Sequence, residues 1–177
     1  MEHSSAQNHK KIGIISARFA DEDGVSLEAY KWAEIFRRMG HDSYFLAGEM
    51  DIPQCIIPTG KGLEDISIIN KLFHFDNEQI KEIYNSCFGT EECLTGKAKK
   101  TIDRLKDKIK EDVSRFVDGF SIDTLVTENA LTIPMNIPLG LALSEFITES
   151  AMATLAHHHD FFWERERFNI NNIEHIL

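Results

Sequence analysis

Residues 11–47, KIGIISARFADEDGVSLEAYKWAEIFRRMGHDSYFLA, decide the fold. The apolar run at residues 11–16 predicts a buried parallel strand. After a polar loop, apolar residues recur at spacings of 4, 3, 4 and 3, which predicts one face of a helix that ends at Gly40. The members of this face are Val25, Ala29, Trp32, Phe36 and Met39. Residues 41–47 then predict a second strand, so the stretch forms a βαβ unit with a parallel sheet and a right-handed crossover.

The middle of the chain predicts one short strand and two helices. Residues 55–58 are apolar and are a candidate third strand. Residues 77–87 predict a helix that Asn77 caps at its start. Residues 98–116 place apolar side chains at helical spacing among many charged ones, which predicts an amphipathic helix with a solvated outer face.

The last third of the chain continues the alternation of strands and helices. Residues 123–127 predict a strand, and Asn136 and Pro138 stand where a helix would be capped and opened. Residues 151–156 predict a final strand. No repeat and no Gly/Ser linker divides the chain. We therefore expect one Rossmann-like, three-layer α/β/α domain with a mainly parallel sheet over residues 11–177.

Composition and charge limit the possible partners and the compartment. The 177 residues contain 19 Lys and Arg against 29 Asp and Glu, and this net charge of −10 argues against nucleic acid as a partner. Residues 1–10 form a polar leader without the apolar centre of a signal peptide, and no apolar run is long enough to predict a membrane span. Cys55, Cys87 and Cys93 contain no C-x-x-C pair and predict reduced thiols. These features indicate a cytoplasmic protein.

Three polar loops follow the carboxyl ends of predicted strands, at residues 18–24, 128–136 and 157–165. Ligands of open parallel sheets bind beyond those ends, so we expect the three loops to converge on one site. Gly24 precedes the first helix, whose exposed N–H groups attract anions. The full dinucleotide fingerprint G-x-G-x-x-G is absent from this loop.

A run of histidines closes the final strand. His157 and His159 are expected to share one side of it, and with Asp160 they could ligate zinc or iron. The H-x-H-x-D-H spacing of metallo-β-lactamase-like hydrolases is absent, so we expect no metal and keep a metal hydrolase as a lesser alternative. A core or surface role is favoured for His157 and His158, whereas His159 is the candidate to bind a ligand. Trp163 and Phe162 are a candidate sugar-stacking platform, with core packing equally favoured.

Three stretches together resemble the N-terminal half of a retaining GT-B glycosyltransferase of family 4. They are the opening βαβ unit (residues 12–46), residues 127–140, and HHHDFFWER at residues 157–165, which is similar to the HHHDFYWER motif of bacterial members. The resemblance covers roughly residues 11–168. It departs from the family at Asp23, where many relatives have a second glycine, and in length, because family members are about twice as long and carry a second, donor-binding domain.

The resemblance implies roles for residues in the first two loops. Gly24 and Val25 would face the sugar donor across the cleft between the two halves of the enzyme. Asn129 and Asn136 would bind hydroxyl groups of the acceptor.

In the third loop, the resemblance implies catalytic and acceptor-binding roles. His159 would orient the reacting sugar, and Asp160 would hold this histidine or bond to the acceptor. Arg165 would bind an anionic acceptor group or pair with Glu164. Trp163 would contribute to acceptor binding.

The resemblance also implies the partners. The co-substrate would be a nucleotide-sugar donor, with no cofactor and no metal, and a hydroxyl acceptor would receive a hexose with retention at the anomeric carbon. The C-terminal donor domain would be the other partner, so we expect this chain to be an acceptor-side half with little transferase activity by itself. Peripheral membrane contact is expected only if the acceptor is a lipid. The main alternative is a stand-alone module that binds a nucleotide or sugar without catalysis.

Overall fold

The structure, a computed structural model, describes residues 9–20, 23–90 and 92–173. Its centre is a parallel five-stranded sheet with the strand order β3-β2-β1-β4-β5. The strands are β1 (Lys11–Ile15), β2 (Asp42–Ala47), β3 (Ser67–Ile69), β4 (Thr124–Glu128) and β5 (Thr154–His157). The chain returns from the edge strand β3 to the far side of β1, so the strand order reverses between β1 and β4, as in Rossmann-like folds.

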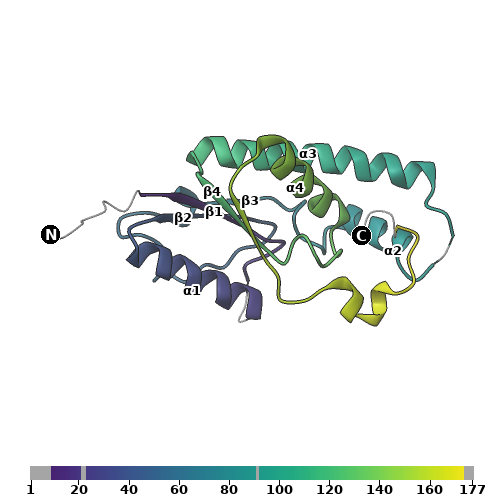
Figure 1. Cartoon of the computed structure of the whole chain (residues 1–177), viewed down its shortest axis with the longest axis horizontal. Coiled ribbons are helices and arrows are strands. Elements are labelled where there is room, and N and C mark those ends of the chain that lie inside the picture. The colour runs from purple at the N-terminus through teal and green to yellow at the C-terminus, as the bar shows by residue number, and fades with distance from the viewer. Residues whose placement is uncertain (1–8, 21–22, 91, 174–177) are drawn as a thin grey trace.

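Helices cover both faces of this sheet (Figure 1). The α-helices are α1 (Gly24–Arg38), α2 (Glu78–Cys87), α3 (Gly96–Phe120) and α4 (Ile137–Ser150). Helix α1 lies on one face, whereas α3 and α4 pack against each other on the opposite face. Three short 3₁₀ helices are η1 (Leu63–Asp65), η2 (Phe162–Glu164) and η3 (Glu166–Phe168). This arrangement confirms the predicted α/β class with a parallel sheet.

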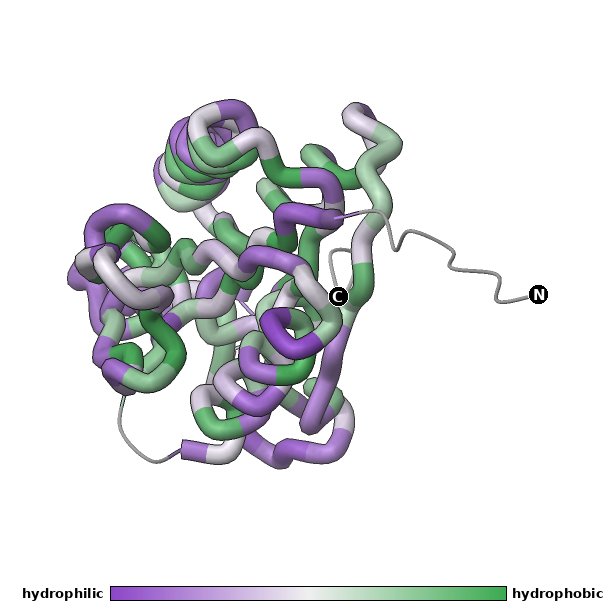
Figure 2. The backbone as a smooth tube through the Cα atoms, turned by 90° about the vertical axis from the view of Figure 1, so that its left-hand side faces the viewer, coloured by the Kyte–Doolittle hydropathy of each residue, from purple (hydrophilic) through white to green (hydrophobic). Residues whose placement is uncertain are grey.

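The end of α1 and the start of α2 lie where the sequence predicts, whereas α3 extends beyond the predicted residues 98–116 at both ends. Asn77 caps α2 by accepting a hydrogen bond from the Gln79 N–H at 3.0 Å, and Gly40 has a φ of 83°, which permits the turn after α1. Helix α3 buries one face and exposes the other, as its charge pattern predicts. Figure 2 shows this kind of alternation as green and purple bands along the helical coils.

Two predicted strands needed correction. Residues 55–58 are not a strand, because the N–H groups of Ile56 and Ile57 bond back to nearby carbonyls and form turns. The third strand is β3, which pairs with the end of β2 over only three residues. The last strand begins at Thr154 instead of Ala151, because α4 continues to Ser150 and Ala151 ends it with a left-handed φ of 51°.

The core lies between the sheet and its helices, and the sheet approaches α3 closely at Gly13. A Cβ atom on Gly13 would lie 2.8 Å from the Phe116 ring and 3.1 Å from Leu125. A side chain there would therefore push the helix away from the sheet. A second, smaller cluster joins α2 to η3 and the segment after it, where Phe168 and Ile173 are buried.

Three further predictions concern the ends of the chain, the membrane and the cysteines. Residues 1–8 of the predicted polar leader lie outside the described residues. None of the described helices has the length and apolarity needed to cross a membrane. Cys55, Cys87 and Cys93 are free thiols, as the sequence predicts, and burial raises the pKa of Cys87.

Candidate functional site

A cleft of about 340 Å³ lies at the carboxyl ends of β1 and β4, where the strand order reverses. We call it the switch-point cleft. All three predicted loops line it. Its principal lining residues are Arg18, Gly24 and Val25 after β1, Asn129 and Asn136 after β4, and His159 and Asp160 after β5. The expected convergence of the loops is therefore present, at the position where open α/β sheets bind ligands.

The loop after β1 contributes an accessible glycine, Gly24, and the guanidinium of Arg18 to the cleft lining. A Cβ atom on Gly24 would meet no atom within 4 Å, so neighbouring packing does not require glycine there. Asp23 caps α1 by accepting from the Ser26 N–H at 2.8 Å. The Nε of Arg18 pairs with Asp23 at 3.2 Å, and its guanidinium lies 5.3 Å from the centre of the Phe75 ring. Gly24 therefore lines the cleft beside the ion pair of Arg18 and Asp23.

Asn129 joins the ends of β4 and β5. Its backbone is left-handed, with a φ of 57°, a conformation that asparagine tolerates better than most residues. Its N–H donates to the His157 carbonyl at 2.9 Å, and its side-chain oxygen accepts from the His159 N–H at 3.1 Å. The side-chain oxygen is thus bonded within the protein, whereas the amide nitrogen has no hydrogen bond to another described residue.

Asn136 has a structural task at the start of α4. Its side-chain nitrogen donates to the carbonyls of Leu72 and Phe73 at 2.9 and 3.0 Å, and its oxygen accepts from the Leu139 N–H at 3.1 Å. The residue is buried, although it lines the cleft. The predicted helix cap is confirmed. The amide hydrogens that the resemblance assigned to an acceptor are instead bonded to protein carbonyls.

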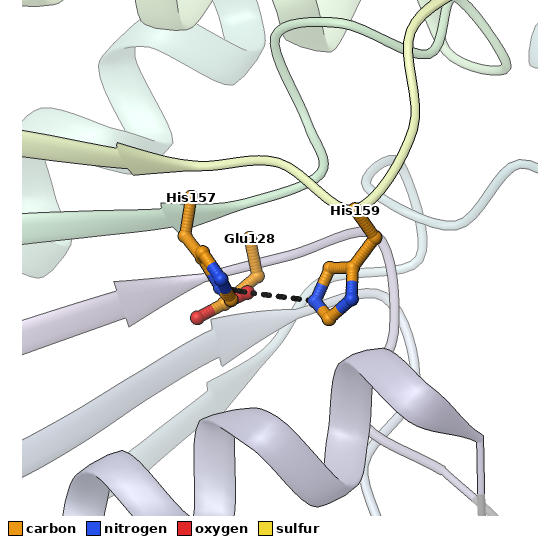
Figure 3. Close-up of side chains that lie close together, drawn as sticks. All are labelled: Glu128, His157 and His159. Carbon is orange, nitrogen blue, oxygen red and sulfur yellow. Dashed lines mark hydrogen bonds and ion pairs between the residues drawn. The ribbon is translucent and has the colours of Figure 1, made fainter. Parts of the chain in front are cut away.

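Glu128 and two histidines gather at the ends of β4 and β5 (Figure 3). Glu128 is only 1% exposed and stands opposite His157 in the β4–β5 register. Its Oε2 lies 2.8 Å from the Nδ1 of His157 and 3.6 Å from the Nε2 of His159. Trp32 stacks on the His157 ring with centroids 4.9 Å apart. His157 at the end of β5 and His159 two residues beyond it thus point to the same side, as predicted.

Burial raises the pKa of Glu128, and the two neighbouring imidazoles oppose that effect without cancelling it. The sequence pattern put Glu128 at the start of the second loop, whereas it is the last residue of β4, and it did not identify Glu128 as the partner of the histidines. The signal for it is positional, because the last residue of β4 faces the last residue of β5. His158 lies elsewhere, with its Nδ1 3.2 Å from the Thr132 hydroxyl, and burial lowers its pKa.

The remaining predicted residues of the third loop are arranged differently from expectation. Asp160 pairs with Arg165 and does not hold His159, which instead lies beside Glu128. The alternative pairing of Arg165 with Glu164 is also wrong, because the Glu164 carboxylate accepts from the Phe161 N–H at 2.9 Å. This local bond turns Glu164 back toward its own 3₁₀ helix.

Trp163 is exposed at the surface and does not line the switch-point cleft among the described residues. Its side chain is 62% exposed, which excludes the core position that its residue type equally favoured. It stacks on Phe161 with ring centroids 4.6 Å apart and ring planes 14° from parallel. Trp163 therefore presents an exposed aromatic face and stacks on the half-buried Phe161, which follows the cleft residue Asp160 in the chain.

Comparisons with known proteins give similarity over most of this chain. It is 28% identical over 157 residues to mannosylglucosylglycerate synthase from Petrotoga mobilis and 29% identical over 157 residues to the protein of that name from Thermotoga maritima. In both cases 88% of this chain aligns with 33% of the relative, so the chain spans about a third of the length of the curated relatives it matches. No protein-family model and no solved structure matches the sequence.

Proposed function

We propose that this chain is the acceptor-binding, N-terminal part of a nucleotide-sugar-dependent retaining glycosyltransferase of the GT-B type. The observation that carries the proposal is the switch-point cleft, in which three loops distant in sequence meet at the carboxyl edge of a Rossmann-like sheet. The similarity to two mannosylglucosylglycerate synthases adds support, because that name describes a glycoside built from two hexoses and glycerate.

In this proposal the loop after β1 faces the donor. The bond between the anomeric carbon and the nucleoside diphosphate breaks as the acceptor oxygen bonds to the same face of that carbon, and the acceptor proton passes to the departing phosphate. Negative charge then develops on the diphosphate. The N-terminus of α1 at Gly24 and Val25 and the guanidinium of Arg18 are suited to stabilise that charge.

The loops after β4 and β5 hold the acceptor and the reacting sugar. His159 lines the cleft with its Nε2 toward the buried Glu128 carboxylate, so its other ring nitrogen, Nδ1, is the one left to bond a hydroxyl of the reacting sugar. The amide nitrogen of Asn129 is positioned to contact the acceptor. Asp160 and Arg165 form an ion pair at the rim, where the arginine offers a charge to an anionic acceptor.

The acceptor class follows from these cations and from the names of the relatives. A glycerate unit carries a carboxylate as well as hydroxyl groups. Arg18 lines the cleft, and Arg165 pairs with the lining residue Asp160, so a cation lies on each of two loops that meet there. We therefore propose an acceptor with both a free hydroxyl and a carboxylate, and a hexose as the transferred group.

The proposal is tested on the intact protein that contains this chain. Release of nucleoside diphosphate is measured with a panel of nucleotide-sugars, with glycerate glycosides and with the matching uncharged glycosides. Release that depends on the carboxylated acceptor is expected. His159→Ala is expected to lower the rate by about 100-fold or more, whereas the control His158→Ala, next to it but bonded to Thr132, changes it little.

Two results would contradict the proposal. The first is tight binding of a nucleotide or sugar with no diphosphate release for any pairing, which would identify a binding module. The second is release that is equally lowered by the His159 and His158 substitutions, because the switch-point cleft would then not contain the reacting groups.

A further inference from the structure

We propose that Glu128, His157 and His159 form a binding site for a divalent transition-metal ion of the zinc class. Each residue offers one ligand atom, and these atoms lie within 4.8 Å of one another. The three side chains point toward a common centre from the ends of β4 and β5 (Figure 3). A set of two imidazoles and one carboxylate binds zinc or iron in preference to calcium or magnesium, which favour oxygen ligands.

The spacing of the ligand atoms already approaches that of a metal site. Tetrahedral zinc holds nitrogen and oxygen ligands at about 2.0–2.1 Å, which places any two ligand atoms about 3.4 Å apart. The Oε2 of Glu128 lies 2.8 Å from one imidazole nitrogen and 3.6 Å from the other. All three ligand atoms lie within 4.8 Å of one another, so the side chains would have to close by at most about 1.4 Å per pair to reach the spacing of a tetrahedral site.

The burial of Glu128 supplies the reason to bind a cation. The residue is 1% exposed, and its Oε1 has no hydrogen-bond partner in the described part of the chain. A buried carboxylate is costly unless its charge and its lone pairs are satisfied. No lysine or arginine among the described residues pairs with it, and the two imidazoles are its nearest potential cations. A divalent ion bound at Oε2 beside the two imidazoles would balance the negative charge of this buried carboxylate.

The two histidines are also held in place before any ion binds. Trp32 stacks on the ring of His157, and the Asn129 N–H bonds to its carbonyl. The side-chain oxygen of Asn129 fixes the backbone of His159. Such support reduces the conformational entropy lost when the ligands close around a metal.

The site is open on one side. Glu128 and His159 line the switch-point cleft, so a fourth ligand can come from there as water or as an oxygen of a bound molecule. The set differs from the His157, His159 and Asp160 combination considered from sequence, because Asp160 pairs with Arg165. It also adds a metal to a transferase for which the family resemblance implies none.

The test measures the metal alone on chelator-treated, metal-free protein. Zn²⁺ is titrated by calorimetry, and Co²⁺ by the visible absorption that distinguishes four-coordinate from octahedral ions. One ion per chain with a four-coordinate Co²⁺ spectrum is expected. His157→Ala, His159→Ala and Glu128→Gln are each expected to weaken binding by more than about 100-fold, beyond the usual cost of losing a supporting residue.

His158→Ala is the matched control, since it removes a neighbouring imidazole that contacts Thr132 and not Glu128, and binding should stay within a few-fold of the unsubstituted protein. Circular dichroism checks that each variant folds. If His157→Ala does not fold, His159→Ala decides the question, because the side chain of His159 is 26% exposed and lies at the rim. No stoichiometric binding, an octahedral Co²⁺ spectrum, or equal weakening by His158→Ala would overturn the proposal. Because no sugar is present, such a failure would leave the proposed transferase function standing.

Discussion

Replacing Asn136 with alanine is expected to lower the free energy of unfolding by about 3 kcal/mol, because the amide caps α4 and also ties it to a distant segment. The loss of the capping bond to the Leu139 N–H costs about 1 kcal/mol. The two bonds from the amide to the carbonyls of Leu72 and Phe73 add about 1 kcal/mol each, and one of these bonds is buried.

The matched control is Asn77→Ala, which removes the cap of α2 and only one exposed bond. Its expected cost is about 1 kcal/mol, so the difference between the two variants isolates the two bonds to carbonyls. Equilibrium unfolding in urea at constant pH measures both. The reasoning is refuted if Asn136→Ala costs no more than Asn77→Ala, and a stable Asn136 variant that has lost acceptor binding would restore the ligand-binding role implied by the family resemblance.

Three further substitutions test the core and the cleft. Gly13→Ala is expected to cost about 1–3 kcal/mol in urea unfolding, because its Cβ would lie 2.8 Å from the Phe116 ring, and an unchanged midpoint would contradict this. Gly24→Ala meets no atom within 4 Å, so stability should be kept or gain up to about 1 kcal/mol while diphosphate release by the intact protein falls. Burial raises the pKa of Tyr30 from its ordinary value of 10 to about 12. The contribution of this side chain to the free energy of unfolding is therefore complete below pH 10 and is lost as pH rises toward 12. Over that range the native protein should lose about 2–3 kcal/mol relative to Tyr30→Phe, and parallel pH profiles of the two proteins would disprove it.

Local sequence patterns predicted most of the fold, because the periodicity of apolar residues within one helix or strand is enough to identify that element. The βαβ unit at residues 11–47 follows from an apolar run, a helical spacing and Gly40, and the structure places all three as expected. Strand β3 could not be found in this way. It has three residues, and Ile68 and Ile69 are exposed at the sheet edge, so its pairing with β2 and not its composition makes it a strand. The apolar residues 55–58 satisfied the same pattern but form turns.

For the candidate site, the sequence predicted where the residues lie but not which side chains bond to one another. The rule that ligands bind at the carboxyl ends of parallel strands was enough to bring Gly24, Asn129 and His159 together. It could not identify which side chains bond to one another. The pairing of Asp160 with Arg165 depends on the path of the chain through the 3₁₀ helix at residues 162–164, and no periodic pattern predicts that path.

The partner of Glu128 depends on the register between β4 and β5, which couples the fold to the chemistry of the site. Side chains alternate between the faces of a strand, so a slip of one residue would move His157 to the opposite face and bring His158 toward Glu128. Asn129 opposes that slip, because its left-handed backbone directs its N–H to the His157 carbonyl while its side chain bonds to the His159 N–H. A residue whose predicted role was to bind the acceptor therefore also determines which histidines reach the buried carboxylate.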